Sequence, residues 1–186
     1  MPLTAPILQG TRLRLRALVE ADRADLFAIF SDPEVMRYWS GPPWTSPQQA
    51  DRLYEADAAG LRDGDALRFG IELGGHVVGC VSVFRISESS RRAELGYLLH
   101  RAVWGLGIAT EACTLALDHA FGAMNLHRME ADTDPRNHAS VRLLTGLGFR
   151  QEGVLRERWI VGDEISDSAW FGLLAREWRA RRVTGG

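Results

Sequence analysis

Lysine is absent from the sequence, because all 22 basic residues are arginine. A chain without lysine cannot form a lysine Schiff base with a carbonyl substrate. It also cannot contain the phosphate-binding loop that ends in Gly-Lys-Ser/Thr. Cysteine is scarce: Cys80 and Cys113 are too few for a disulfide scaffold. These shortages exclude enzymes that form a lysine Schiff base, proteins with that phosphate-binding loop, and small secreted domains stabilised by disulfides.

Long apolar runs and a strong net charge are also missing. No apolar segment approaches the roughly 20 residues that a membrane helix needs, and the N-terminal MPLTAPILQG lacks the basic and apolar parts of an export signal. A net charge of −2 and a pI near 6.2 provide no basic footprint for nucleic acid. We therefore expect a cytoplasmic protein that binds neither nucleic acid nor a membrane.

What remains is an ordinary globular composition, with 46% hydrophobic and 25% charged residues among 186. A chain of this length buries enough surface to fold without a metal or a disulfide. No internal repeat and no linker-like tract divides it. The sequence therefore predicts one domain over residues 1–186.

Hydrophobic periodicity predicts an α/β (α+β) fold, a mixed sheet with helices on both faces. Strands are predicted over 11–18, 67–73, 77–84, 91–100, 127–133, 151–161 and 164–174, and helices over 20–30, 46–61, 107–121 and 137–147. Gly74-Gly75 is typical of a hairpin turn, and Ser46-Pro47-Gln48-Gln49 of a helix start. Arg12, Arg14 and Arg16 alternate with leucines and indicate the solvated face of an edge strand, with a binding role as the alternative.

The segment Trp104-Gly105-Leu106-Gly107-Ile108-Ala109-Thr110-Glu111-Ala112 carries the most chemical information. Two glycines one residue apart allow the backbone to approach a ligand closely, and the helix that follows offers unpaired N–H groups beside its positive dipole end. The pattern favours a phosphate or diphosphate site. The alternative is a helix start that only packs against a strand. Thr110 replaces the third glycine of the dinucleotide fingerprint, so a dinucleotide enzyme is a weaker hypothesis.

This segment and three other motifs together resemble the GNAT superfamily of acetyl-CoA-dependent N-acetyltransferases. The branch most similar contains the ribosomal-protein N-terminal acetyltransferases. The other motifs are Ala93-Glu94-Leu95-Gly96-Tyr97, Asn137-His138-Ala139-Ser140 and Gly146-Leu147-Gly148-Phe149. They occur in the family's order and with similar gaps. The opening strand and Asp32-Pro33-Glu34-Val35-Met36-Arg37-Tyr38 are similar too, so the resemblance covers nearly the whole chain.

The resemblance implies a mostly antiparallel sheet with splayed central strands and acetyl-CoA in the cleft between them. It implies an acceptor-side part over about 1–66, a cofactor-binding core over about 67–150 and a C-terminal hairpin over about 151–176. The implied cofactor contacts are Tyr97, Leu98, Leu99, Gly105, Leu106, Gly107, Ile108, Ala109, Thr110 and Asn137. Dimers are common in the family, so a homodimer is an open alternative.

The sequence departs from the family pattern at two places. Trp104 stands where the family loop begins with glutamine or arginine, which removes a side-chain contact but not the backbone cradle. Leu144 stands where many relatives have a tyrosine general acid. The branch resembled here has a serine after the asparagine, and Ser140 occupies that place.

Acyl transfer to an amine requires a base for the ammonium and an acid for the leaving thiolate. Ser140 is the candidate acid; the alternative is that it only bonds to the backbone behind the N-cap Asn137. Glu94 is the candidate base, acting through a water, and the alternative is a solvated or arginine-paired strand carboxylate near Arg91 or Arg92. Glu130 and Asp132 are rivals for the base.

The aromatic residues Tyr38, Trp39 and Trp44 either wall the acceptor pocket or cover a core edge. No histidine spacing suggests a metal site, and both cysteines fit a core role. The sequence thus predicts an acetyl-CoA-dependent transferase that acetylates a primary amine, either a protein N-terminus or a small molecule. A donor such as succinyl-CoA, or a non-catalytic acyl-CoA sensor, stays as an alternative.

Overall fold

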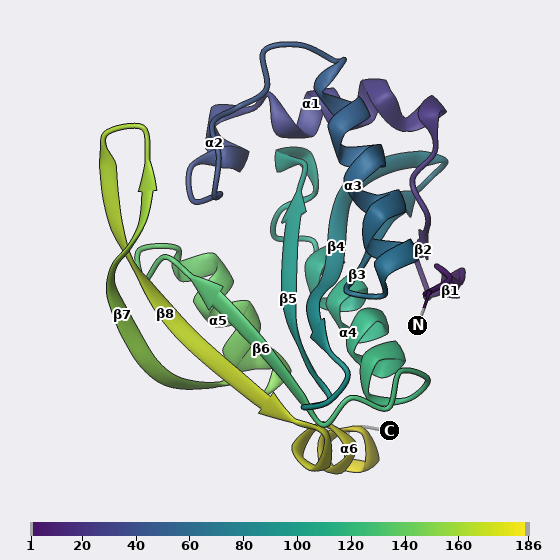
Figure 1. The fold of residues 1–186 in the computed structure, drawn as a ribbon, viewed down its shortest axis with the longest axis vertical. Coiled ribbons are helices and arrows are strands. Elements are labelled where there is room, and N and C mark those ends of the chain that lie inside the picture. Colours follow the sequence, from purple (N-terminus) through teal and green to yellow (C-terminus); the bar gives the residue numbers. More distant parts are fainter. Residues whose placement is uncertain (1, 185–186) are drawn as a thin grey trace.

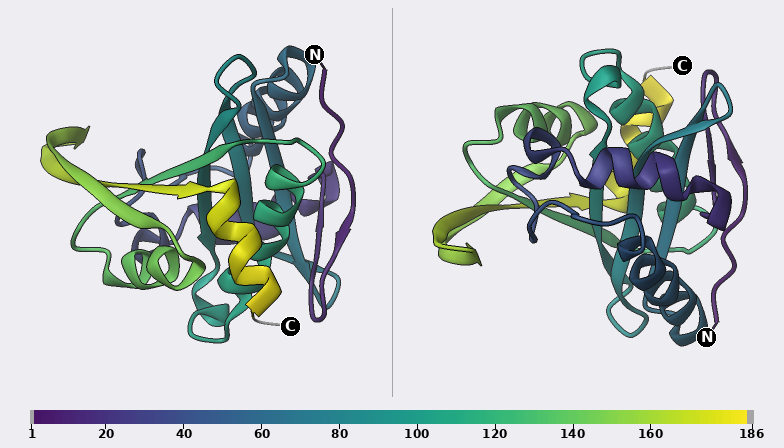
Figure 2. Two further views of the ribbon diagram at one scale, coloured as in Figure 1. Left: turned by 90° about the horizontal axis from the view of Figure 1, so that it is seen from below. Right: turned by 90° about the horizontal axis from the view of Figure 1, so that it is seen from above.

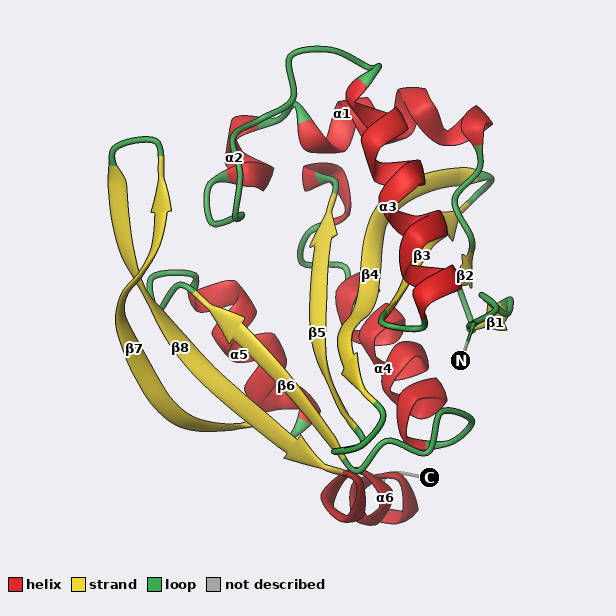
Figure 3. Cartoon of the chain, viewed as in Figure 1, coloured by secondary structure: helices red, strands yellow, loops and turns green. Residues whose placement is uncertain are grey.

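An eight-stranded sheet forms the centre of the computed structural model, which describes residues 2–184. The strand order is β1-β2-β3-β4-β5-β6-β8-β7, and among the strands of the described residues only the β5–β6 pair is parallel. The strands are β1 (Leu8–Gln9), β2 (Arg14–Arg16), β3 (Ala66–Leu73), β4 (His76–Ser87), β5 (Arg92–Leu99), β6 (Arg128–Thr133), β7 (Arg150–Val161) and β8 (Glu164–Leu174). The helices are α1 (Arg23–Phe30), α2 (Pro33–Met36), α3 (Gln49–Asp63), α4 (Ile108–Phe121), α5 (His138–Leu147) and α6 (Ala175–Thr184), with 3₁₀ turns η1 (Glu20–Asp22) and η2 (Arg101–Val103). Figures 1 and 3 show the arrangement.

The predicted mixed α/β architecture is confirmed, with helices on both faces of the sheet. Figure 2 shows α3 on one side and α4 and α5 on the other. One hydrophobic core packs α4, α5 and Trp178 of α6 against one face of the sheet, and a second packs α1 to α3 against Val77, Cys80 and Leu98 on the other. Cys113 belongs to the first core and Cys80 to the second, and burial raises the pKa of the Cys80 thiol to about 12. Both thiols are core groups, as predicted.

Two predicted elements begin elsewhere. The strand expected over 11–18 is regular only at Arg14–Arg16. The helix expected from Pro47 begins at Gln49, whose side-chain oxygen accepts from the backbone N–H groups of Thr45 and Ser46 at 2.7 and 3.1 Å. The bond from Ser46 is one half of a capping box, the motif in which the side chain of the fourth residue accepts from the backbone N–H of the first. It holds the preceding turn outside the helix.

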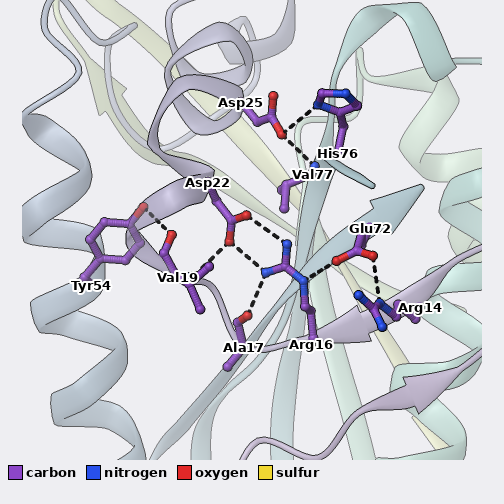
Figure 4. Close-up of polar contacts among 10 residues, drawn as sticks. All are labelled: Arg14, Arg16, Ala17, Val19, Asp22, Asp25, Tyr54, Glu72, His76 and Val77. Atoms are coloured by element: carbon purple, nitrogen blue, oxygen red, sulfur yellow. Dashed lines mark hydrogen bonds and ion pairs between the residues drawn. The ribbon is translucent and has the colours of Figure 1, made fainter. Parts of the chain in front are cut away.

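The arginines of β2 form an ion-pair network that fixes α1 to the sheet (Figure 4). Arg16 donates to both oxygens of Asp22 at 2.8 Å and also pairs with Glu72, which accepts from Arg14 at 2.7 Å. Arg14 and Arg16 are therefore paired and not merely solvated. Because η1 leads directly into α1, the network holds the α1–α2 segment over the sheet.

The central strands splay, as the resemblance implies. β5 and β6 pair only at Arg92, Ala93 and Glu94, opposite residues 128–130. Beyond Glu94 the two strands diverge (Figure 1), and the edge of β5 that faces β6 has no strand partner.

Within residues 2–184, no helix combines the length and the apolar character needed to cross a bilayer.

Candidate functional site

A cleft opens where β5 and β6 diverge. Its volume is about 1140 Å³, more than the roughly 1000 Å³ at the upper end for one small ligand. Its walls come from β3 to β6, the loop after α2, the starts of α4 and α5, and the β7–β8 hairpin. The cleft therefore has room for two reactants and collects side chains from the whole chain.

Most residues predicted as site residues line this cleft. They are Tyr38, Trp39, Glu94, Tyr97, Leu98, Leu99, Gly105, Gly107, Ile108, Ala109, Thr110, Asp132, Asn137 and Ser140. Two do not line it: Leu106 has an exposed side chain, and Trp44 stacks on Phe30 with ring centroids 4.4 Å apart. The prediction that Trp44 walls the pocket is corrected, because its ring belongs to the core beneath α1.

Tyr38 and Trp39 differ from Trp44 in facing the cleft. The guanidinium of Arg37 lies 5.3 Å from the centre of the Tyr38 ring, and that of Arg136 lies 6.0 Å from it. Arg136 follows β6, on the other wall of the cleft, and also pairs with Asp134 and Glu164. The Tyr38 ring thus links the two walls at the end of the cleft near α2.

The glycine loop has the backbone geometry that the sequence predicts. Gly105 and Gly107 have φ angles of 73° and 74°, and Gly107 is the N-cap of α4 without a side-chain cap. A Cβ added to Gly105 meets nothing within 4 Å, so the loop surface is open. In the described part of the chain, no hydrogen bond uses the N–H groups of Gly105 to Thr110. These donors at the positive end of a helix dipole suit an anion.

Trp104 takes part in this arrangement through its ring. Its Nε1 donates to the carbonyl oxygen of Leu99 at 2.9 Å. That bond occupies the Leu99 carbonyl and turns the indole toward the end of β5. The main-chain groups of Tyr97 lie earlier on the edge that β6 leaves uncovered, whereas those of Leu98 alternate toward β4.

Ser140 and Tyr97 form a hydroxyl pair across the cleft. Asn137 caps α5 by accepting from the Ser140 N–H at 3.1 Å, whereas the Ser140 hydroxyl lies 2.7 Å from the Tyr97 hydroxyl. Burial raises the pKa of the Tyr97 phenol. The phenol is therefore protonated at neutral pH and can donate to Ser140. The Tyr97 side chain was not predicted as a functional group, since its partner is 43 residues away in the sequence.

Glu94 is buried, 4% exposed, yet it is one of the residues that line the cleft. Both its oxygens accept from Nη1 of Arg85, at 3.1 and 3.0 Å. The predicted alternative partners, Arg91 and Arg92, are wrong: Arg92 pairs with Glu130 instead. Arg85 lies at the register shift between β4 and β5 and has a φ of 51°, a local irregularity that alternating patterns do not reveal.

The two rival carboxylates lie in different environments. Glu130 pairs with Arg92 and Arg128 and does not line the cleft, which removes it as a base. Asp132 lines the cleft, but its Oδ2 accepts from Trp159 Nε1 and Ser168 Oγ, both at 2.9 Å. Asp132 thus ties β6 to the β7–β8 hairpin.

Arg12 and Glu111 are a further pair that sequence patterns missed. Nε of Arg12 donates to Glu111 Oε2 at 2.8 Å, and Nη1 donates to the Leu106 carbonyl at 2.7 Å. The interpretation of Arg12 as only a solvated strand residue is corrected, because the pair joins positions 99 residues apart. No signal within either segment indicates the contact.

Comparison with known proteins gives one consistent result. Residues 12–150 match the family model described as "Acetyltransferase (GNAT) domain". The N-acetyltransferase p20 of Bacillus licheniformis is 36% identical over 173 residues, which cover 92% of this chain and 97% of that protein. RimJ of Mycobacterium smegmatis, solved with CoA-disulfide, matches with a TM-score of 0.86 and 27% identity, over 98% of this chain and 95% of that one. Spermidine N-acetyltransferase of Vibrio cholerae, solved with CoA and spermine, matches with a TM-score of 0.81 and 26% identity, over 91% and 99% of the two chains.

Proposed function

The chain belongs to the GNAT acetyltransferase family, and from that premise we propose that it transfers the acetyl group of acetyl-CoA directly to a primary amine. The acceptor is a protein N-terminus or a small-molecule amine. The observation that carries the proposal is the open glycine loop at the start of α4, beside a cleft with room for two reactants. Direct transfer requires both substrates to occupy the cleft together.

The donor end of the cleft suits coenzyme A. The free N–H groups of residues 105–110 would bind its diphosphate. The uncovered edge of β5 at Tyr97 and Leu98 would lie beside the pantetheine arm, and the Tyr97 N–H would be offered to the thioester carbonyl. Asn137, which begins α5 on the other wall, is a further proposed contact.

In the proposed reaction the amine nitrogen attacks the acetyl carbonyl carbon, so that a C–N bond forms and the C–S bond breaks. The ammonium first loses a proton to Glu94 through a water molecule. The departing thiolate takes the Ser140 hydroxyl proton, and the Tyr97 phenol replaces it across their 2.7 Å contact. The second proton, which the nitrogen loses as the amide forms, returns to the Tyr97 phenolate through water, and Glu94 releases its proton to solvent. Arg85 holds the Glu94 carboxylate at the cleft surface. Asp132 is the second candidate for the base, with one carboxylate oxygen already engaged.

Tyr38 and Trp39, which line the same cleft as Glu94, are the proposed acceptor wall. The relatives named above include an enzyme solved with spermine, so polyamines belong in any acceptor panel. We test the proposal by measuring thiol release from acetyl-CoA and succinyl-CoA with amino acids, polyamines and synthetic peptides. Mass spectrometry of the same mixtures then identifies the modified amine.

The proposal is supported if CoA is released and the amine becomes about 42 Da heavier, the mass change when an acetyl group replaces a hydrogen. About one mole of acetylated product should form per mole of thiol. If the protein prefers succinyl-CoA, the proposed acyl donor changes, but the proposed transferase activity is retained. If calorimetry shows that acetyl-CoA binds but no acceptor causes thiol release, the proposal is contradicted. The non-catalytic acyl-CoA sensor is then the remaining hypothesis.

Replacing Glu94 by glutamine tests the base. The amide has the same shape and cannot take up a proton, so we expect the rate to fall by about 100-fold or more. The acidic limb of the pH–rate profile, which reports the group that must lose its proton to act as base, should change shape. The matched control is Glu130→Gln, which alters another buried, arginine-paired carboxylate outside the cleft. An unaltered profile in the Glu94 variant transfers the role to Asp132 or to solvent.

A further inference from the structure

Arg12 holds the glycine loop from a distant part of the chain. Its Nη1 donates to the Leu106 carbonyl at 2.7 Å, and its Nε donates to Glu111 Oε2 at 2.8 Å. The Arg12 backbone N–H donates to the other oxygen, Oε1, also at 2.8 Å. One residue therefore fixes both the middle of the loop and the first turn of α4.

The N-terminal segment is shaped around this contact. A Cβ added to Gly10 would lie 2.6 Å from Glu111 Oε1, so only glycine allows the chain to pass so closely. A Cβ added to Gly107 would lie 3.3 Å from Arg12 Nη2. In the described part of the chain, Nη2 has no hydrogen-bond partner. The second guanidinium nitrogen thus lies unpaired beside the N-cap of α4.

Glu111 explains why a cation is needed there. A carboxylate in the first helical turn can bond the free N–H groups of that turn, and its charge repels a bound anion. Burial opposes ionisation of Glu111, but the bonds from Arg12 prevail and lower its pKa, so the group is charged at neutral pH. Because Arg12 engages both oxygens, the carboxylate points away from the N–H groups that the loop presents.

We propose that Arg12 is a positioning residue for the diphosphate of the acyl donor. It fixes the Leu106 carbonyl, keeps Glu111 from capping α4, and balances the Glu111 charge beside the anion. This inference rests on the proposed function, since it concerns the same donor site.

The test compares two donors, acetyl-CoA and S-acetylpantetheine, which has the thioester but lacks the diphosphate. In Arg12→Met we expect kcat/KM for acetyl-CoA to fall by about 10- to 100-fold, the range for losing a charge-assisted contact. The kcat at saturation and kcat/KM for S-acetylpantetheine should stay near the wild-type values. The matched control is Arg14→Met, two residues further along the chain in β2, since Arg14 has nearly equal exposure (46% against 47%) and pairs with Glu72 (Figure 4).

Two further variants separate positioning from folding. Arg12→Lys keeps the positive charge but loses the forked guanidinium group. Its loss of kcat/KM for acetyl-CoA should therefore be smaller than that of Arg12→Met. Glu111→Gln removes the competing charge, and adding it to Arg12→Met should restore part of the lost kcat/KM, because the two residues act together. These variants also carry the test if Arg12→Met does not fold.

Equal losses with both donors, or a double variant whose defects simply add, overturn the inference and leave Arg12 a structural residue. Wild-type kinetics in Arg12→Met overturn it as well. If the wild-type protein neither binds nor uses acetyl-CoA, the proposed function fails, and that result is recognisable before any variant is made.

Discussion

Gly107→Val should abolish acetyl-CoA binding while leaving a folded protein. Gly107 is the N-cap of α4 with a φ of 74°, a conformation that a β-branched residue strongly disfavours. The new side chain would also meet Arg12 Nη2, 3.3 Å from the added Cβ. Relief of either strain moves the N–H groups that converge on the diphosphate. Losing two such bonds corresponds to an affinity lower by about 100-fold or more.

The matched control is Gly74→Val, in the turn between β3 and β4. Gly74 has a φ of 60°, and a Cβ added there meets nothing within 4 Å. Both variants incur backbone strain of about 1–2 kcal/mol, so their melting temperatures should fall to a similar extent. Calorimetric titration with acetyl-CoA should show binding in the wild type and Gly74→Val only. Retained affinity in Gly107→Val would contradict the assignment of the loop.

The sequence predicted the strands and helices best where local signals agree. Gly74-Gly75 adopts positive φ at both residues and joins β3 to β4. Gly148 directly follows the helix predicted over 137–147 and is the left-handed C-cap of α5, with a φ of 97°. In such places hydrophobic spacing and turn chemistry indicate the same structure, and neither depends on distant residues.

Helix α6 was not predicted, because it has no apolar stripe. Charged residues surround Trp178, which is buried against the first core and donates from Nε1 to Asp118 at 2.9 Å. Arg182 pairs with the same carboxylate at 3.0 Å. Contacts with α4, rather than the helix's own periodicity, stabilise this helix, and such contacts are invisible to pattern analysis.

The candidate site was predictable in its backbone and less so in its charges. The loop and N-cap positions follow from glycine and asparagine placed at helix starts. The partner of Glu94 depends on a strand irregularity at Arg85, and that of Glu111 on the packing of the N-terminal segment. Ion pairs of this kind are set by register and tertiary packing, so neighbours in the sequence, such as Arg91 and Arg92, are misleading candidates.

Ser140→Ala should lower kcat by about 100-fold or more, the usual contribution of a positioned general acid. The Ser140 backbone N–H makes the bond to Asn137, so the cap of α5 survives the substitution. Alanine also favours helix. We therefore expect unchanged thermal stability and unchanged affinity for acetyl-CoA. Ser166→Ala, which removes another cleft hydroxyl, is the matched control.

Tyr97→Phe tests whether the two hydroxyls act as one proton relay. The ring and its packing are retained, and only the group 2.7 Å from Ser140 is removed. If the relay operates, the double variant should be no slower than Ser140→Ala alone, because residues that act as a unit are not additive. The defect should also shrink with an acetyl thioester of a more acidic thiol, whose thiolate leaves without a proton. Additive losses, or a defect independent of the leaving thiol, would argue that Ser140 and Tyr97 only shape the cleft.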